Sequence, residues 1–152
     1  MEEVQYNPNK DGNTLILTVG LAGSGKSTWA RNQEHVVVSP DAVRLAMHGQ
    51  PFISQAEDLV WATVKLMVKH HFISNPGTTV ILDATNITRA QRDEWISSDW
   101  DLLFAVFDTP FDVCMERRMK TNFPPEILHQ MHDVLDLPDR SGIQIIHWEP
   151  PA

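Results

Sequence analysis

The sequence predicts a single α/β domain, built on a parallel sheet of five strands with helices on both faces. Three observations lead to this prediction. The chain has 152 residues, which suits one compact domain. Short apolar runs alternate with stretches of helical pattern along the sequence. Strands that alternate with helices usually form a parallel sheet, because each helix brings the chain back to start the next strand in the same direction.

Five apolar runs are the expected strands, and they cover residues 15–19, 35–38, 79–82, 102–107 and 143–146. The expected helices follow the first four strands, at 26–33, from 39, 54–73, 88–97, from 109 and 124–137. The last two of these would form a small helical lid between the fourth and fifth strands. Capping boxes predict two of the helix starts, at Ser54-Gln55-Ala56-Glu57 and Thr88-Arg89-Ala90-Gln91.

The helix expected at 54–73 carries an apolar stripe at helical spacing. It consists of Ala56, Val60, Val64, Met67 and His71, widened by Leu59, Leu66 and Val68.

We expect residues 1–13 to form a flexible arm, 14–148 the domain and 149–152 a tail. The polar N-terminus lacks the basic and apolar regions of a signal peptide. The apolar runs are far shorter than the ~20 residues that a membrane span needs. The single cysteine, Cys114, excludes a disulfide within the chain. These features suit a cytoplasmic protein with no membrane partner.

The net charge is −8, from 12 basic and 20 acidic side chains. A broad electrostatic grip on a nucleic-acid backbone is therefore not expected. A small basic pocket is still compatible with this charge, because a binding site needs only local charge.

The segment Gly20–Ser27 matches the phosphate-binding loop pattern G-x-x-x-x-G-K-[ST] at every fixed position, between an apolar strand and a helix. In such loops glycines let several backbone N–H groups point at one anion, the lysine reaches the β- and γ-phosphates, and the hydroxyl binds magnesium. The alternative is a glycine-rich turn without a ligand. We predict that ATP is bound by Gly20, Gly23, Ser24, Gly25, Lys26, Ser27 and Thr28, with Lys26 also catalytic.

Asp83 ends the third expected strand, where phosphate-loop enzymes place an acid that holds Mg²⁺. We predict Ser27 and Asp83 as the magnesium site. The alternative is that Asp83 only caps a turn, as aspartate often does.

The second strand leads into Ser39-Pro40-Asp41, and Arg44 follows three residues later on the same helix face. In an open α/β sheet, functional groups gather at the carboxyl ends of strands. Asp41 could therefore take the proton of an attacking hydroxyl, and Arg44 could orient it or bind a phosphate. Alternatively, Asp41 only stabilises a helix N-terminus.

Together these motifs resemble the phage polynucleotide 5′-kinase family and the small zeta-toxin-like P-loop kinases, over residues 15 to about 137. The resemblance rests on Gly20–Ser27 with 28–31, Asp41-x-x-Arg44, Asp83–Asn86 with Arg89 and Arg92, and Phe107–Pro110 with a basic helix. It implies that Asp41 is the general base and that Arg44 contacts both acceptor and base.

The family usually places two arginines four residues apart in the helix after the fourth strand. Here Arg117 is followed by Thr121 at that spacing, with Arg118 and Lys120 nearby. We choose Arg118 as the catalytic arginine, although spacing does not separate it from Arg117. The alternative is that the basic run is only a solvated helix face.

Other candidates carry less chemistry. His129 and His132 have no third ligand placed for a metal, and Cys114 is expected to be buried and inert. The tryptophans are read as packing residues, with one open alternative: the helix that carries Trp61 could cover the acceptor site.

The expected reaction is transfer of the γ-phosphoryl group of ATP, with Mg²⁺, to an alcohol. The order of the motifs favours the 5′-hydroxyl of a polynucleotide, with Arg89 or Arg92 as helpers in holding a backbone phosphate. The acidic charge favours a small alcohol: a nucleoside, a nucleotide sugar or a hydroxymethyl base. A third possibility is an ATP-binding switch or NTPase module without an acceptor of its own.

Overall fold

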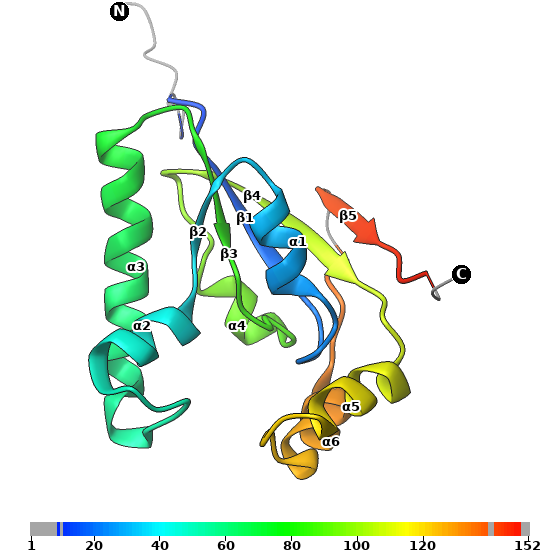
Figure 1. The fold of residues 1–152 in the computed structure, drawn as a ribbon. Coiled ribbons are helices and arrows are strands. Elements are labelled where there is room, and N and C mark those ends of the chain that lie inside the picture. Colours follow the sequence, from blue (N-terminus) through cyan, green and yellow to red (C-terminus); the bar gives the residue numbers. More distant parts are fainter. Residues whose placement is uncertain (1–8, 10, 140–141, 150–152) are drawn as a thin grey trace, which may run out of the picture.

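The computed structural model of the chain describes residues 9, 11–139 and 142–149. They form one five-stranded parallel sheet in the order β2-β3-β1-β4-β5 (Figure 1). The strands are β1 (Thr14–Val19), β2 (Val36–Val38), β3 (Thr79–Leu82), β4 (Asp101–Phe107) and β5 (Ile143–Ile146). The predicted fold class is confirmed, and each strand lies within one residue of its expected bounds.

The helices also follow the predicted order. They are α1 (Lys26–Asn32), α2 (Pro40–His48), α3 (Glu57–Ser74), α4 (Arg89–Asp93), α5 (Phe111–Met119) and α6 (Pro125–Val134), with a 3-10 turn, η1 (Ser54–Ala56), before α3. Helices α5 and α6 stand between β4 and β5, where the small helical lid is expected, and they lie together below the sheet in Figure 1.

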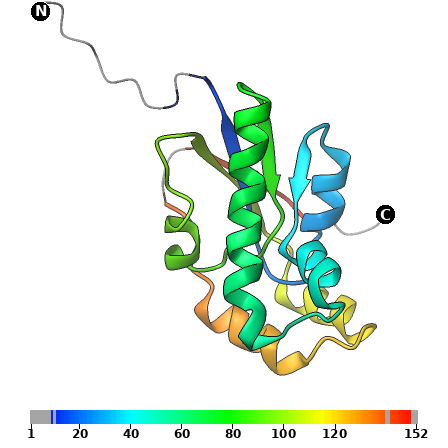
Figure 2. The same ribbon diagram turned by 90° about the vertical axis from the view of Figure 1, so that its left-hand side faces the viewer.

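The main core lies between α3 and one face of the sheet. Figure 2 shows the full length of α3 running beside the strands. Val60, Val64, Val68 and Phe72 are buried, and a spacing of four residues places them along one side of the helix. Burying each such side chain contributes about 1.5–3 kcal/mol. They pack with the inward residues Leu15, Leu17, Val80, Leu82, Phe104 and Val106.

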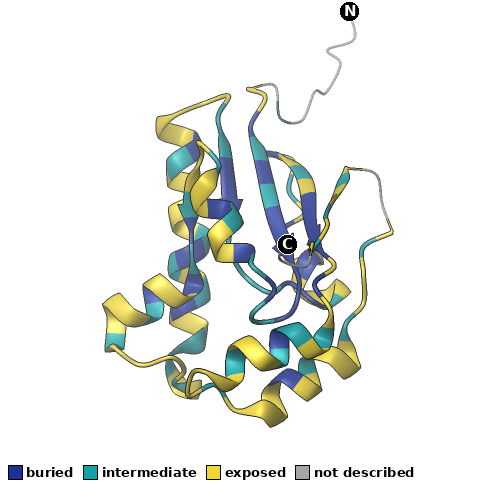
Figure 3. Ribbon diagram, turned by 45° about the vertical axis from the view of Figure 1, so that its right-hand side comes forward, coloured by how far each residue is buried: buried dark blue, intermediate teal, exposed yellow. Residues whose placement is uncertain are grey.

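The predicted apolar stripe of α3 is therefore only half correct. Val60, Val64 and Val68 belong to it, but Leu59, Leu66 and Met67 are 62%, 68% and 44% exposed. Figure 3 shows the same division, with buried strands at the centre and exposed outer helix surfaces. The stripe is narrower than expected because a single row of side chains, four residues apart, meets the sheet.

Helix α1 covers the opposite face. The Trp29 ring meets the Phe107 ring edge-on, with 5.7 Å between centroids, whereas Val106 belongs to the α3 side. Successive strand residues point to opposite faces, so these two contacts place α1 and α3 on different sides of the sheet.

One predicted capping box is present and the other is wrong. Thr88 caps α4, accepting from the backbone N–H of Gln91, while the Gln91 side chain accepts from Thr88 N. Ser54 makes no such cap, because its segment winds into the 3-10 turn and the Glu57 carboxylate pairs with Arg44 instead. Helix α4 also ends earlier than expected, at Asp93.

Asn13 joins the start of β1 to its neighbours. Its side chain accepts from Gly77 N at 2.8 Å and donates to Asp99 O at 3.0 Å, and only 5% of the residue is exposed. The rest of the predicted arm, apart from Asn9, Asp11 and Gly12, lies outside the described residues, as do 150–152 of the predicted tail. Within the described part of the chain, no helix has the length and apolar character to cross a membrane.

Candidate active site

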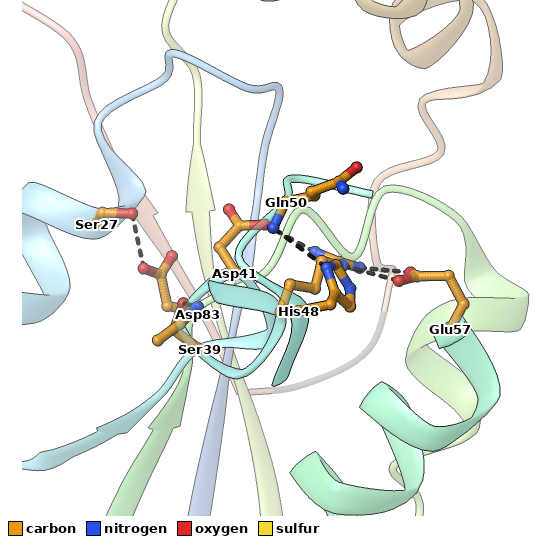
Figure 4. Close-up of polar contacts among 9 residues, drawn as sticks. Ser27, Ser39, Asp41, His48, Gln50, Glu57 and Asp83 are labelled. Carbon is orange, nitrogen blue, oxygen red and sulfur yellow. Dashed lines mark hydrogen bonds and ion pairs between the residues drawn. The ribbon is translucent and has the colours of Figure 1, made fainter. Parts of the chain in front are cut away.

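A large cleft opens across the carboxyl ends of β1, β2 and β3. Its volume is about 1710 Å³. Ten of the eleven predicted site residues line it, all but Gly20: the six residues Gly23–Thr28, Arg118, Asp41, Arg44 and Asp83. Asp83 lies between Ser27 and Asp41 (Figure 4). The topology explains the convergence, because the carboxyl ends of parallel strands meet at one edge of the sheet.

The phosphate-binding loop has the backbone shape that its glycines allow. Gly23 and Gly25 have φ of 84° and 98°, a region that L-residues rarely adopt. Gly20 stands behind the loop, where a Cβ would lie 2.8 Å from the Ser24 Oγ. The following helix α1 begins at Lys26, so its N-terminal N–H groups face the loop.

Lys26 is buried and held by the loop itself. Its Nζ donates to Leu21 O at 2.6 Å and to Ser24 Oγ at 3.3 Å, and the residue is 7% exposed. Burial lowers the pKa of Lys26 to about 8, although the negative charge of Asp83 opposes the shift. Asp83 is the largest of the negative charges that stabilise the ammonium, and Asp41 adds a smaller effect.

Ser27 and Asp83 meet directly, with Ser27 Oγ donating to Asp83 Oδ2 at 2.7 Å. Figure 4 shows the pair on the side of the site nearest the loop. A hydroxyl and a carboxylate oxygen at one point are donors that suit Mg²⁺. Among residues 9, 11–139 and 142–149 no cluster of three or more Asp, Glu, His or Cys side chains could enclose a metal. Such a Mg²⁺ would need phosphate oxygens and water to complete its shell.

Asp41 and Arg44 form the far side of the site. Ser39 caps α2 by accepting from Ala42 N, with Pro40 in the first turn, as the sequence predicts. Asp41 Oδ1 accepts from Arg44 Nη1 at 2.7 Å, and 88% of the Asp41 side chain is exposed. The carboxylate is therefore held at one oxygen, and its surface is accessible from the cleft.

Glu57 is the site residue that the sequence analysis missed. It accepts from Arg44 Nε at 2.9 Å and from Nη2 at 2.7 Å, a two-point pairing across helices (Figure 4). Hydrogen bonding to Glu57 raises the pKa of Arg44, and hydrogen bonding to Arg44 lowers the pKa of Glu57. No local pattern indicates this pair, because the residues are thirteen apart and Glu57 also fits a capping box.

The two lid arginines occupy different positions. Arg117 Nη1 donates to Gly23 O at 2.9 Å, and the residue is otherwise exposed. Arg118 is half-buried beside the loop, where a Cβ on Gly23 would lie 3.2 Å from its Nε. That Nε is buried without a hydrogen-bond partner among the described residues, and the Arg118 charge acts to lower the pKa of Lys26. Lys120 does not line the cleft.

The predicted helper role of Arg89 and Arg92 does not fit their positions. Both line a separate hollow of about 70 Å³ and not the large cleft. Arg92 is 4% exposed and donates to Asn86 O and Asp136 O, so it ties α4 to the segment after α6. Arg89 lies outside the cleft, 3.6 Å from Asp93. The arginines follow Asp83 in sequence, but α4 turns them away from it.

Two further residues at the end of β4 support the cleft. Thr109 Oγ1 donates to Ser24 O at 2.8 Å, which joins the start of α5 to the loop. Asp108 accepts from Trp148 N and pairs with His147 Nδ1, each at 2.7 Å, and these contacts lower the pKa of Asp108. The Phe107–Pro110 motif is the sequence signal for both, although it specifies neither contact.

The histidines, the cysteine and the tryptophan to which the sequence analysis gave no catalytic role make packing contacts or line the cleft. His129 and His132 both pack against the Phe111 ring, at 5.0 and 4.6 Å between centroids. Cys114 is fully buried as expected, and burial raises its pKa. Trp61 lines the cleft beside Arg44, so α3 borders the cleft on the side of Asp41. That this side receives an acceptor stays a prediction.

Comparison with known proteins agrees with this geometry. A family described as an AAA domain matches residues 15–138. The chain belongs to this family. Its fold is that of the P-loop kinases, with the phosphate-binding loop, the strand-end acid and the five-stranded sheet in the expected places. No curated protein matches the sequence.

Solved structures share the fold over most of the chain. One is a chain of the Pnkp1/Rnl/Hen1 RNA repair complex, with 24% identity, a TM-score of 0.71, and coverage of 88% of this chain and 46% of that one. A second is a gluconokinase from Sinorhizobium meliloti 1021, with 19% identity, a TM-score of 0.64, and coverage of 97% of this chain and 86% of that one. A third is Chaetomium thermophilum Kti12 in complex with ADP-AlF3, with 16% identity, a TM-score of 0.67, and coverage of 89% of each chain. The chain spans less than half the length of the RNA repair relative.

Proposed function

We propose that this chain is an ATP-dependent kinase that transfers the γ-phosphoryl group to the 5′-hydroxyl end of a polynucleotide. The observation that carries the proposal is the exposed carboxylate of Asp41, which faces the same cleft as Lys26 and is oriented by Arg44. A base on one side of a cleft and a phosphate cradle on the other is the arrangement that in-line transfer to a hydroxyl requires.

The donor half of the cleft binds and orients the triphosphate. Backbone N–H groups of residues 23–28 would bind the phosphates, and Lys26 would neutralise charge that develops on the transferred group. The residues present fit Mg²⁺–ATP, which when bound supplies the electrophilic phosphorus and a cation on its oxygens. Ser27 and Asp83 would hold that cation.

The acceptor half holds the hydroxyl and removes its proton. Asp41 accepts the proton as the oxygen attacks, and Arg44 keeps the carboxylate turned towards the cleft. Arg118 stands beside the loop with an unpaired Nε, close to where charge accumulates during transfer. We assign the in-cis arginine role to Arg118, because Arg117 is engaged by the Gly23 carbonyl.

The walls beside Asp41 support a nucleic-acid acceptor. Leu45 and Phe52 line the cleft and are 70% and 62% exposed. Exposed aromatic and apolar side chains next to the proposed general base, Asp41, and to Arg44 offer a surface on which a nucleobase of the acceptor can stack. The large size of the cleft also suits the end of a polymer, since the chain beyond the reacting nucleotide needs an exit.

A small alcohol is the second candidate, and a specific contact favours it. Glu57 already pairs with Arg44, so Asp41, Arg44 and Glu57 together carry a charge of −1. A neutral acceptor such as a nucleoside meets no repulsion there.

The test is incubation with labelled ATP and a panel of acceptors: a 5′-hydroxyl oligonucleotide, the free nucleoside and a sugar alcohol. The proposal expects the oligonucleotide to be the best substrate, with a shallow loss of rate as salt rises, because only one or two phosphates are bound. Equal or better use of a small alcohol, with no salt effect, would establish the second candidate. ATP binding without any phosphorylated product would indicate a switch or NTPase module.

A further inference from the structure

Beyond the proposed function, on which it rests, we infer that Glu57 sets the acceptor selectivity of the site. By pairing with Arg44, Glu57 limits the contact that Arg44 can make with the phosphate next to the reacting hydroxyl of a polynucleotide end, so the wild-type preference for such acceptors is smaller than Arg44 alone would give. Glu57 is thus a specificity-determining residue that acts through Arg44, and it makes no contact with the reacting atoms.

The contacts show how fully Arg44 is engaged. A guanidinium has five N–H donors. In Arg44 the Nε and one Nη2 hydrogen go to Glu57 and one Nη1 hydrogen goes to Asp41, at 2.7–2.9 Å. Two N–H groups are left for an acceptor phosphate, and none of them belongs to the Nε–Nη2 edge, one of the two edges on which Arg binds oxyanions at two points.

The surroundings strengthen the pairing. The side chains of Arg44 and Glu57 are only 14% and 18% exposed, so solvent screens their attraction less than on an open surface. The Arg44 guanidinium also lies 5.9 Å from the centre of the Trp61 ring, which limits the directions in which it can turn. A phosphate must therefore either displace Glu57 or bind beside it.

The net charge around Arg44 also opposes the binding of a phosphate there. Asp41, Arg44 and Glu57 sum to −1, and a phosphate placed beside Arg44 would also meet the two carboxylates. Removing the charge of Glu57 brings the sum to zero, and in Glu57→Gln it frees at least one guanidinium N–H, because an amide has only one acceptor oxygen. The selectivity should then move towards phosphate-bearing acceptors.

The experiment compares adenosine with adenosine 3′-monophosphate, two acceptors that share a 5′-hydroxyl and differ by one phosphate. In Glu57→Gln, we expect the kcat/KM ratio of the phosphorylated over the unphosphorylated acceptor to rise about tenfold, since hydrogen bonds to charged groups are the strong ones. The gain should appear in KM for the phosphorylated acceptor. A residue that only held Arg44 in place would lower kcat for both acceptors and leave the ratio unchanged.

Two further variants guard this result. Asp58→Asn removes the same charge from the same helix turn, but Asp58 is exposed, does not line the cleft and should leave the ratio unaltered. Glu57→Asp keeps the charge on a shorter side chain and should raise the ratio less than Glu57→Gln, in the same direction. An unchanged or lower ratio in both Glu57 variants, or an equal rise in Asp58→Asn, overturns the inference.

Direct binding separates this inference from the proposed function. If wild-type protein phosphorylates neither compound, the 5′-kinase proposal fails. In that case the role of Glu57 can still be tested by calorimetric titration of wild type and of Glu57→Gln with adenosine 3′-monophosphate, which measures binding directly. Tighter binding to Glu57→Gln than to wild type supports the inference, and equal or weaker binding refutes it.

Discussion

The donor and acceptor halves of the cleft are built by different kinds of contact. On the donor side, Lys26 is 7% exposed and bonded to atoms of its own loop, two and five residues away. On the acceptor side, Asp41 is 88% exposed at the side chain and depends on Arg44, which in turn depends on Glu57 in another helix. The donor half is therefore shaped by local backbone, and the acceptor half by tertiary pairing.

This difference indicates which part of the cleft can stay the same among P-loop kinases, the phosphate-binding loop, and which part can vary, the side chains on α2 and α3. Every donor nucleotide presents the same phosphates, so a fixed loop serves all of them. An acceptor differs from one kinase to another, and exposed side chains on α2 and α3 can change without disturbing the loop. Substitutions should therefore affect ATP binding on one side and acceptor use on the other.

The largest effect should come from Lys26→Ala, which should abolish transfer. In the proposed mechanism the lysine neutralises charge on the transferred group, and the loop holds its Nζ through the carbonyl oxygen of Leu21. Labelled-ATP transfer measures the loss, and circular dichroism should show an intact fold. Turnover near the wild-type level would disprove the assignment of the loop.

The next effect should come from Arg118→Ala, with a loss of about 10³-fold or more in kcat if it acts as the in-cis arginine. Arg117→Ala is the matched control, because it removes the neighbouring charge and only a bond to Gly23 O. Its loss should be clearly smaller. A larger loss of kcat in Arg117→Ala than in Arg118→Ala would assign the in-cis arginine role to Arg117 instead.

Asp41→Asn should lower kcat by about 10²–10⁴-fold while ATP binding is retained. This variant tests the separation of the halves most directly, because the amide keeps the shape of the carboxylate but cannot accept the proton. Nucleotide titration alongside turnover gives both values. If ATP affinity falls as much as kcat, Asp41 has a metal-binding or structural role.

The smallest effect should come from Asp83→Asn, which should mainly raise the magnesium requirement, by about tenfold or more. Asp83 Oδ2 accepts from Ser27 Oγ at 2.7 Å, so the variant should weaken one proposed cation ligand and the orientation of the other. Rate as a function of Mg²⁺ concentration measures the shift. A titration curve identical to that of wild type would contradict the assignment.

The same division explains how far sequence could predict the site. The loop, the strand-end Asp83 and the Ser39–Pro40–Asp41 start of α2 are local patterns, and the structure places all three at one edge of the sheet. Their chemical roles are still proposals. Asp41 and Arg44 form the predicted pair because three residues span one helix turn.

The parts that sequence could not give depend on packing. The Arg44–Glu57 pairing requires α2 and α3 to lie against each other, and nothing in residues 44–57 indicates that contact. Arg92 fits a catalytic pattern but is turned inwards to carbonyls of Asn86 and Asp136. The inner row of α3 was misjudged for a similar reason, since the sheet, not helical spacing alone, selects which apolar residues are covered.

The contacts of α5 with the phosphate-binding loop also bear on how the cleft closes. Thr109 and Arg117 each donate to a loop carbonyl, at Ser24 and Gly23, from opposite ends of the α5 segment. Anchored at two points, α5 should travel with the loop as one rigid body. Any closing of the cleft would then have to come from the side of Asp41 and Arg44, where α2 and α3 would move together because Glu57 pairs with Arg44.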